Sequence, residues 1–87
     1  MKESKKPRIL HIDDDENYLY VFSKKFKEYF DTVSSPGTLD ALQKLSSDSF
    51  DAIITDYDLP DKNGLDLLRI IKKDFPQIPV IFFTGQG

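Results

Sequence analysis

Cysteine is absent from the sequence of 87 residues. Disulfide bonds therefore cannot stabilise the chain, and a reducing, cytoplasmic location is expected. No apolar run approaches the ~20 residues that a membrane span needs, and the basic N-terminal start lacks the apolar stretch of a signal peptide. Basic residues are outnumbered, 12 against 15 acidic ones, and the net charge of −3 argues against general nucleic-acid binding.

The remaining composition is that of an ordinary globular domain. Hydrophobic residues make up 39% of the chain and charged residues 31%. The length allows one domain, and neither internal repeats nor low-complexity tracts divide it. Residues 1–7 are polar and basic and are predicted to form a disordered tail, which leaves residues 8–87 for the folded domain.

Apolar runs alternate with turn residues along this domain and predict four strands separated by three helices. The strands are expected at residues 8–12, 31–34, 50–55 and 80–84. The first helix should be capped by Asp14 or Asp15 and end near Phe30, and the second should be capped by Thr38. The third helix should carry the apolar positions of residues 65–75.

The alternation of strands and helices indicates an α/β fold, a three-layer doubly wound parallel sheet with helices on both faces. The near-continuous apolar strands agree, because parallel strands are covered on both sides. The segment 31–34 is the weakest strand and is expected at an edge. Ligands bind such sheets at the carboxyl ends of the strands, so the residues that follow each strand are the candidate functional residues.

Aromatic residues recur at helical spacing in the first predicted helix, at Tyr18, Phe22, Phe26 and Phe30. This stripe predicts a face packed into the core, with a partner-binding face as the alternative. His11, within the first strand, is expected to be a hydrogen-bonded strand residue rather than a metal ligand.

Three aspartates follow strands that the topology can bring together. Asp13 and Asp14 end the first strand, and Asp56 ends the third. If these strands are neighbours, about 4.8 Å apart, the carboxylates share one small pocket and raise one another's pKa. A divalent cation offsets that repulsion, and carboxylate oxygens with room for water suit Mg²⁺ or Mn²⁺. Taken alone, the acids at 13–16 could serve only to cap a helix and charge its first turn.

A metal held beside a further carboxylate suits phosphoryl transfer. The ion neutralises the incoming phosphoryl oxygens, and a carboxylate can act as the nucleophile. Asp56 is the best nucleophile candidate, because it lies at a strand tip with a loop above it. Thr84 ends the next strand at the same edge, where its hydroxyl could hydrogen-bond a phosphoryl oxygen.

Three motifs in this order and spacing resemble those of the receiver domain of two-component response regulators. They are Ile9-Leu-His-Ile-Asp-Asp14, Phe50-Asp-Ala-Ile-Ile-Thr-Asp-Tyr-Asp-Leu-Pro-Asp-Lys-Asn-Gly64 and Pro79-Val-Ile-Phe-Phe-Thr-Gly85. The resemblance covers almost the whole chain after the tail. It implies the flavodoxin-like strand order, here 2-1-3-4.

The resemblance implies a role for each matching residue. Asp56 matches the phosphate-accepting aspartate, and Asp14, with Asp13 acting through water, matches the acidic pair that holds Mg²⁺. Asp58 matches the position whose backbone carbonyl is a metal ligand. Thr84 matches the hydroxyl that moves toward the phosphoryl group and signals its presence. The implied donor is a histidine kinase or a phosphotransfer protein, and the domain is a phosphoacceptor rather than a classical enzyme.

The sequence also departs from the pattern of this family. A receiver domain has five strands and five helices, and this sequence ends after the fourth predicted strand. The lysine at the end of a fifth strand has no counterpart, and neither have the fourth and fifth helices that form the usual output surface. We therefore expect the 87 residues to bind metal but to take up phosphate poorly, because the lysine charge stabilises the phosphoryl oxygens.

A different class of function is also open. Without a fifth strand, the segment 80–84 becomes an edge, and its Val-Ile-Phe-Phe run carries no charge. An uncharged apolar edge is typical of a strand that recruits another strand. The alternative is therefore an interaction or assembly element that works without phosphate and pairs with itself through residues 80–84.

Overall fold

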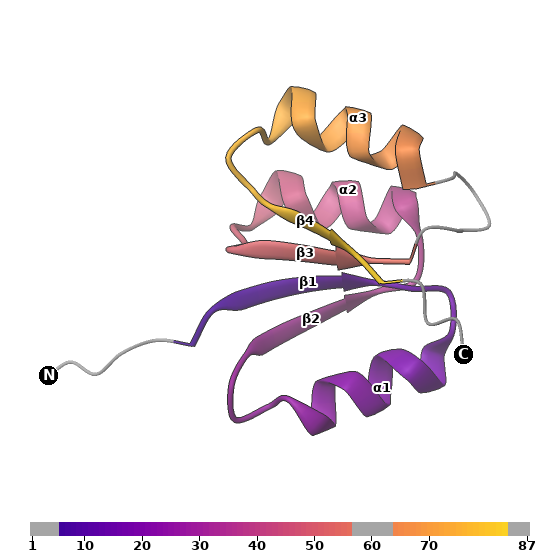
Figure 1. Ribbon diagram of the computed structural model, residues 1–87, viewed down its shortest axis with the longest axis vertical. Coiled ribbons are helices and arrows are strands. Elements are labelled where there is room, and N and C mark those ends of the chain that lie inside the picture. The colour runs from indigo at the N-terminus through magenta and orange to yellow at the C-terminus, as the bar shows by residue number, and fades with distance from the viewer. Residues whose placement is uncertain (1–5, 57–63, 84–87) are drawn as a thin grey trace, which may run out of the picture.

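The computed structural model describes residues 6–56 and 64–83, which form three layers with a sheet in the middle (Figure 1). Four parallel strands make one sheet, in the order β2-β1-β3-β4. The elements are β1 (Arg8–Ile12), α1 (Glu16–Lys25), β2 (Asp31–Ser35), α2 (Thr38–Ser47), β3 (Ala52–Thr55), α3 (Gly64–Asp74) and β4 (Val80–Phe82). The predicted fold class and strand order are confirmed.

The central strand β1 fixes the register of the sheet. Its last residue, Ile12, lies opposite Ser35 of β2 and opposite Thr55 of β3. On the far side of β3, Thr55 lies opposite Phe82 of β4. All four strands run the same way, so their carboxyl ends meet at one edge of the sheet. Within the described residues, β2 and β4 are its outer strands, as predicted for the segment 31–34.

Helices cover both faces of the sheet, α2 and α3 on one face and α1 on the other (Figure 1). The face under α2 and α3 holds the main core, which joins Leu10, Ile12, Ala41, Leu45, Phe50, Ile53, Leu67, Ile71 and Ile78. Each large side chain buried in this way stabilises the fold by about 1.5–3 kcal/mol. Among the helices described, none is long and apolar enough to cross a membrane.

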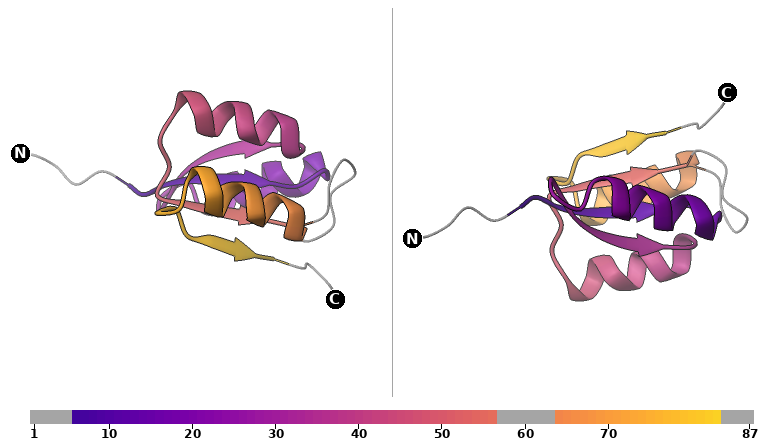
Figure 2. Two further views of the ribbon diagram at one scale, coloured as in Figure 1. Left: turned by 90° about the horizontal axis from the view of Figure 1, so that it is seen from above. Right: turned by 90° about the horizontal axis from the view of Figure 1, so that it is seen from below.

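The face under α1 is covered less completely. Figure 2 shows α1 crossing the middle of the sheet, while β4 lies to one side of the helix. On β4 and directly after it, Ile81 and Phe83 remain 51% and 44% exposed. The outer strand β4 therefore presents apolar side chains to solvent.

The first helix ends earlier than predicted. Asp15 is its N-cap, and the Asp15 side chain accepts a hydrogen bond from the backbone N–H of Tyr18. The helix ends at Lys25 rather than near Phe30. Phe26 is the C-cap and leaves the helical conformation, with φ −108° and ψ 16°. Its carbonyl accepts the N–H groups of Tyr29 and Phe30, each at 2.9 Å, in the turn that leads the chain into β2.

Two further boundaries differ from the prediction. Thr38 is the first residue of α2 and is buried, whereas Gly37 takes the N-cap position without a side-chain hydrogen bond. The strand β3 begins at Ala52 rather than at Phe50. Phe50 instead packs in the core, and Asp51 bonds to Arg8 through both backbone and side chain.

Arg8 fastens the amino end of the sheet. Its guanidinium pairs with the carboxylates of Asp31 at 3.4 Å and Asp48 at 2.5 Å. Its backbone N–H donates to an Asp51 carboxylate oxygen at 2.7 Å, and the guanidinium carbon lies 5.4 Å from the centroid of the Phe50 ring. One residue thus joins the starts of β1, β2 and β3, at the edge opposite to the carboxyl ends of the strands.

The aromatic stripe of α1 packs on His11 in β1. The centroid of the His11 ring lies 4.2 Å from that of Phe22 and 5.4 Å from that of Tyr18. Phe22 is buried, whereas Tyr18, Phe26 and Phe30 are half-buried, so the predicted core face is confirmed in part. The buried Nδ1 of His11 has no hydrogen-bond partner among the described residues, so the prediction of a hydrogen-bonded histidine is wrong for this atom.

Candidate metal centre

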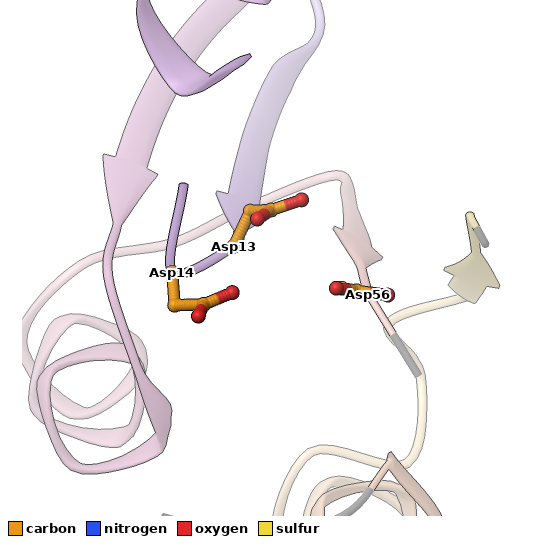
Figure 3. Close-up of side chains that lie close together, drawn as sticks. All are labelled: Asp13, Asp14 and Asp56. Atoms are coloured by element: carbon orange, nitrogen blue, oxygen red, sulfur yellow. The ribbon is translucent and has the colours of Figure 1, made fainter. Parts of the chain in front are cut away.

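Three aspartate carboxylates meet at the carboxyl edge of the sheet. Asp13 and Asp14 follow β1, and Asp56 follows β3. One oxygen from each carboxylate lies within 4.8 Å of the other two. Figure 3 shows Asp13 and Asp14 pointing toward Asp56 from the end of the neighbouring strand. The structure therefore brings together the three carboxylates that the sequence predicts to converge.

Hydrogen bonds from the surrounding chain hold Asp13 in place. Its backbone N–H donates to the Ser35 carbonyl at 3.0 Å, which extends the pairing of β1 and β2 by one residue. Its Oδ1 accepts the backbone N–H of Asp15 at 2.9 Å. Because Asp15 also caps α1, the turn that starts the helix orients Asp13 as well. Asp13 is buried, whereas Asp14 is exposed.

The pairing of β1 with β3 positions Asp56. Its backbone N–H donates to the carbonyl of Ile12 at 3.1 Å. The preceding residue, Thr55, is fully buried, and its carbonyl accepts the N–H of Phe83 at 2.9 Å. Asp56 itself is half-buried. Its carboxylate therefore lies at the tip of β3, between the ends of β1 and β4.

The described part of the site is acidic. Burial raises the pKa of Asp13, the charges of Asp56, Asp14 and Asp15 raise it further, and the hydrogen bond from Asp15 works in the opposite direction. Within residues 6–56 and 64–83, no salt bridge reaches any of the three clustered carboxylates. Several carboxylate oxygens close together are the donor set that suits a hard divalent cation. The residues present fit Mg²⁺ or Mn²⁺.

Tyr18 is a neighbour of the site that the sequence pattern does not identify. Burial raises the pKa of its phenol, and the charges of Asp13 and Asp56 raise it further. Its ring also stacks on that of Phe83, with centroids 5.9 Å apart and planes 15° apart. Helical spacing marks the aromatic stripe of α1, but it does not say which member of the stripe reaches the strand ends.

Two predicted site residues, Asp58 and Thr84, lie outside the described residues. The loop that joins Asp56 to α3 does so as well. The metal contact of the Asp58 carbonyl and the phosphoryl contact of the Thr84 hydroxyl therefore stay predictions. The last described residue of the third motif is Phe83.

Comparison with known proteins points to one family. The family model for the response regulator receiver domain matches residues 9–87. The DNA-binding transcriptional regulator NtrC of Proteus hauseri is 32% identical over 83 residues, which cover 94% of this chain and 18% of that protein. Chemotaxis protein CheY1 of Helicobacter pylori is 28% identical over 85 residues, which cover 92% of this chain and 68% of that protein.

Solved structures share the same architecture. A response regulator receiver domain protein from Clostridium thermocellum matches with a TM-score of 0.85 at 31% sequence identity. The match covers 93% of this chain and 67% of that one. The 87 residues thus correspond to about two thirds of a solved receiver domain and to a small part of a regulator such as NtrC.

Proposed function

The chain belongs to the response regulator receiver domain family, and from this premise we propose that it accepts a phosphoryl group on Asp56. The donor is a histidine kinase or a phosphotransfer protein. The observation that carries the proposal is the convergence of Asp56 with Asp13 and Asp14 at the ends of paired parallel strands. The chain is then a phosphoacceptor in a phosphorelay rather than a classical enzyme. A cysteine-free sequence suits the reducing cytoplasm, and we assign its function to that compartment.

Mg²⁺ is the metal that this donor set would hold, with Mn²⁺ as the alternative. Asp14 and Asp56, with Asp13 through water, would hold the ion. The backbone carbonyl predicted at Asp58 would complete this set. When bound, the cation supplies positive charge that neutralises the phosphoryl oxygens. Without that charge, the three carboxylates would repel an incoming phosphoryl group.

The transfer step forms one bond and breaks one. A carboxylate oxygen of Asp56 attacks the phosphorus of the donor phosphohistidine, and the P–N bond breaks. The electron pair stays on the imidazole nitrogen, which then takes up a proton, and Asp56 carries an acyl phosphate. The hydrogen bond from the Asp56 N–H to the Ile12 carbonyl fixes the backbone of Asp56 at the strand tip. Positioning the nucleophile before attack therefore costs less conformational entropy. The hydroxyl of Thr84 is predicted to donate to a phosphoryl oxygen.

We expect this reaction to be slow in the 87-residue chain. The lysine that the family carries on a fifth strand has no counterpart in the sequence, and such a cation provides much of the stabilisation of the transferring group. Lys72 and Lys73 cannot replace it, because they lie in the last turn of α3, away from the carboxyl ends of the strands (Figure 1).

The direct test uses the purified chain, Mg²⁺ and a small acyl phosphate as phosphodonor. Intact mass spectrometry should show that a fraction of the chains gains about 80 Da, the mass of one phosphoryl group. The increase should require Mg²⁺ and should disappear in Asp56→Asn. The matched control is Asp51→Asn, which changes an aspartate at the opposite edge of the sheet and should be labelled like the wild type.

Each other outcome has a definite meaning. Equal labelling of Asp56→Asn and the wild type would show that Asp56 is not the acceptor. Complete and long-lived labelling would confirm the acceptor and refute the expected slow reaction. Labelling that is absent although Mg²⁺ binds would refute the phosphoacceptor function of this chain.

A second candidate function is assembly through β4, and one observation favours it. Within the described residues β4 pairs only with β3, and two apolar residues on or directly after this strand, Ile81 and Phe83, are 51% and 44% exposed. Exposed apolar edges recruit further strands. On this candidate function, two chains would pair along residues 80–84 without any phosphate chemistry.

Analytical ultracentrifugation tests this candidate. The wild type should self-associate as its concentration rises, and Ile81→Lys should remain monomeric, because a charged residue on an edge strand blocks pairing. Val21→Lys, on the exposed face of α1, is the matched control and should associate like the wild type. A folded wild-type monomer at high concentration would contradict assembly through β4.

A further inference from the structure

We propose that Tyr18 and Phe83 form a positioning pair for the acidic site, in which the ring of Tyr18 holds the end of β4 beside Asp56. The inference rests on the proposed phosphoacceptor function, because it concerns the efficiency of the same site. Neither ring supplies a metal ligand or a nucleophile. Both act through their neighbours, so they are positioning residues and not catalytic ones.

Tyr18 is held in place from two directions. Its backbone N–H donates to the Asp15 side chain at 3.2 Å, which anchors it to the first turn of α1. Its ring meets the buried His11 ring edge-on, with centroids 5.4 Å apart and planes 75° apart. In this position burial raises the pKa of the phenol, and the charges of Asp13 and Asp56 raise it further. The Tyr18 ring therefore packs between His11 of β1 and Phe83, which directly follows β4.

Phe83 connects this ring to the strand that carries Asp56. Its ring stacks on Tyr18 with planes only 15° apart. Its backbone N–H donates to the carbonyl of Thr55, the residue directly before Asp56, at 2.9 Å. Two contacts thus join α1 to the tip of β3, the stack and this hydrogen bond.

The stack matters because the end of β4 lies at an outer position of the described sheet. The strand spans only three residues, Val80–Phe82, and lies at the border of the described sheet. Phe83 as a whole residue remains 44% exposed in spite of the stack. Short outer segments with few buried contacts are the parts of a domain that open most easily. Removing the Tyr18 ring should therefore let the end of β4 move away from Asp56 while β1 and β3 stay paired.

The first test measures two quantities for each variant, the rate at which a small acyl phosphate labels Asp56 and the affinity for Mg²⁺. Tyr18→Leu and Phe83→Leu should each slow labelling of Asp56 about two- to tenfold, as expected for the loss of one aromatic pair. The double variant should be no slower than either single one, because both changes remove the same contact. Mg²⁺ affinity should stay unchanged, because the ligands remain. Tyr18→Phe keeps the ring and should retain the wild-type rate.

A matched control separates this role from general destabilisation. Tyr20→Leu makes the same substitution on the exposed face of α1, where 63% of the residue is accessible, and should leave the rate unchanged. Unchanged rates in Tyr18→Leu would overturn the proposal. A loss of Mg²⁺ affinity that parallels the loss of rate would overturn it as well, since the ring would then support the ligands and not β4.

Nuclear magnetic resonance of the labelled chain gives a second test that needs no phosphorylation. The charge of the site is changed by Mg²⁺ or, without any ligand, by Asp56→Asn. The ring resonances of Phe83 should respond in the wild type and in Tyr18→Phe, but not in Tyr18→Leu, whereas the Asp13 amide should respond in all three. An equal response of Phe83 in Tyr18→Leu would refute the link. If the wild type takes up no phosphate, the proposed function fails, and this measurement still decides the role of the pair.

Discussion

The backbone N–H of Asp56 donates a 3.1 Å hydrogen bond to the carbonyl of Ile12, the residue directly before Asp13. This bond continues the pairing of β1 with β3, in which Ile12 lies opposite Thr55. It holds the backbones of Asp13 and Asp56 at the ends of neighbouring strands. Repulsion between Asp13 and Asp56 is therefore built into the sheet, and burial of Asp13 strengthens it.

Asp56→Asn is expected to stabilise the metal-free chain, because it removes one charge from that repulsion. The gain should be a few tenths to about 1 kcal/mol in the free energy of unfolding, the usual size for partly exposed charges. Urea denaturation at pH 7 with a chelator present measures it. Glu28→Gln removes an exposed negative charge outside the cluster and should change stability less. Destabilisation by Asp56→Asn would contradict the prediction.

Mg²⁺ is expected to stabilise the folded chain, because the ion binds a site that exists only when β1 and β3 are paired. At a hundredfold excess over Kd, the gain is about 2.7 kcal/mol, and the Tm rises by roughly 10–20 °C. Asp14→Asn should remove most of this gain, since Asp14 is a predicted ligand. Thermal unfolding followed by circular dichroism, with and without Mg²⁺, measures the effect.

Asp74→Asn is the control for the metal effect. Asp74 ends α3 and lies outside the three-carboxylate cluster, so this variant should respond to Mg²⁺ like the wild type. An equal response of Asp14→Asn would show that the ion binds elsewhere on the chain.

His11 should make stability fall in mild acid. Burial lowers its pKa to about 4 from the ordinary value of 6.5, so the unfolded chain binds a proton between these values and the folded chain does not. The stability of the folded chain that depends on a neutral His11 is fully present above about pH 6.5 and is lost as the pH falls toward 4. The fall of the pKa from 6.5 to about 4 corresponds to roughly 3 kcal/mol in the free energy of unfolding. Urea denaturation between pH 7 and 4 measures the slope.

His11→Leu is the comparison for this slope. The raised pKa of Asp13 acts in the opposite sense, because protonation of that carboxyl is easier in the folded chain. Asp13 is present in both proteins, so the difference between their slopes reports on His11. Parallel pH profiles would contradict the prediction.

Asp15→Ala should lower stability by about 1 kcal/mol, because the side chain that caps α1 is lost. Asp15→Ser keeps a capping oxygen and should restore most of this loss. Chemical denaturation at pH 7 compares the two variants. Similar stabilities of Asp15→Ala and Asp15→Ser would show that the hydrogen bond to the Tyr18 N–H contributes little.

The sequence was sufficient to predict the sheet and the convergence of the acids. Apolar runs separated by helical patterns impose a parallel sheet, and parallel strands place the residues after β1 and β3 at one edge. Asp13, Asp14 and Asp56 follow those strands directly, so their meeting depends on topology and not on side-chain detail.

The spacing of residues in the sequence could not predict the features that tertiary contacts determine. Phe26 continues the aromatic spacing, so the sequence favours a helix to Phe30, yet the backbone leaves the helical conformation at Phe26, with φ −108° and ψ 16°. Gly37 precedes a threonine that resembles a cap, but Thr38 is instead buried. Tyr18 belongs to the same stripe as Phe22, and only the three-dimensional placement of α1 brings it to the acidic site.

The two ends of the sheet differ in their electrostatics, because Arg8 lies at the amino end and the aspartate cluster lies at the carboxyl end. The amino end is held by attraction between a guanidinium and the carboxylates of Asp31 and Asp48, whereas the carboxyl end gathers three negative charges. Monovalent salt screens the attraction at the amino end and the repulsion at the carboxyl end, so it weakens the first end and stabilises the second. A chelated divalent ion acts chiefly on the second. The ionic composition of the surroundings can therefore redistribute rigidity along the strands, from the end where they begin to the end where they carry the aspartates.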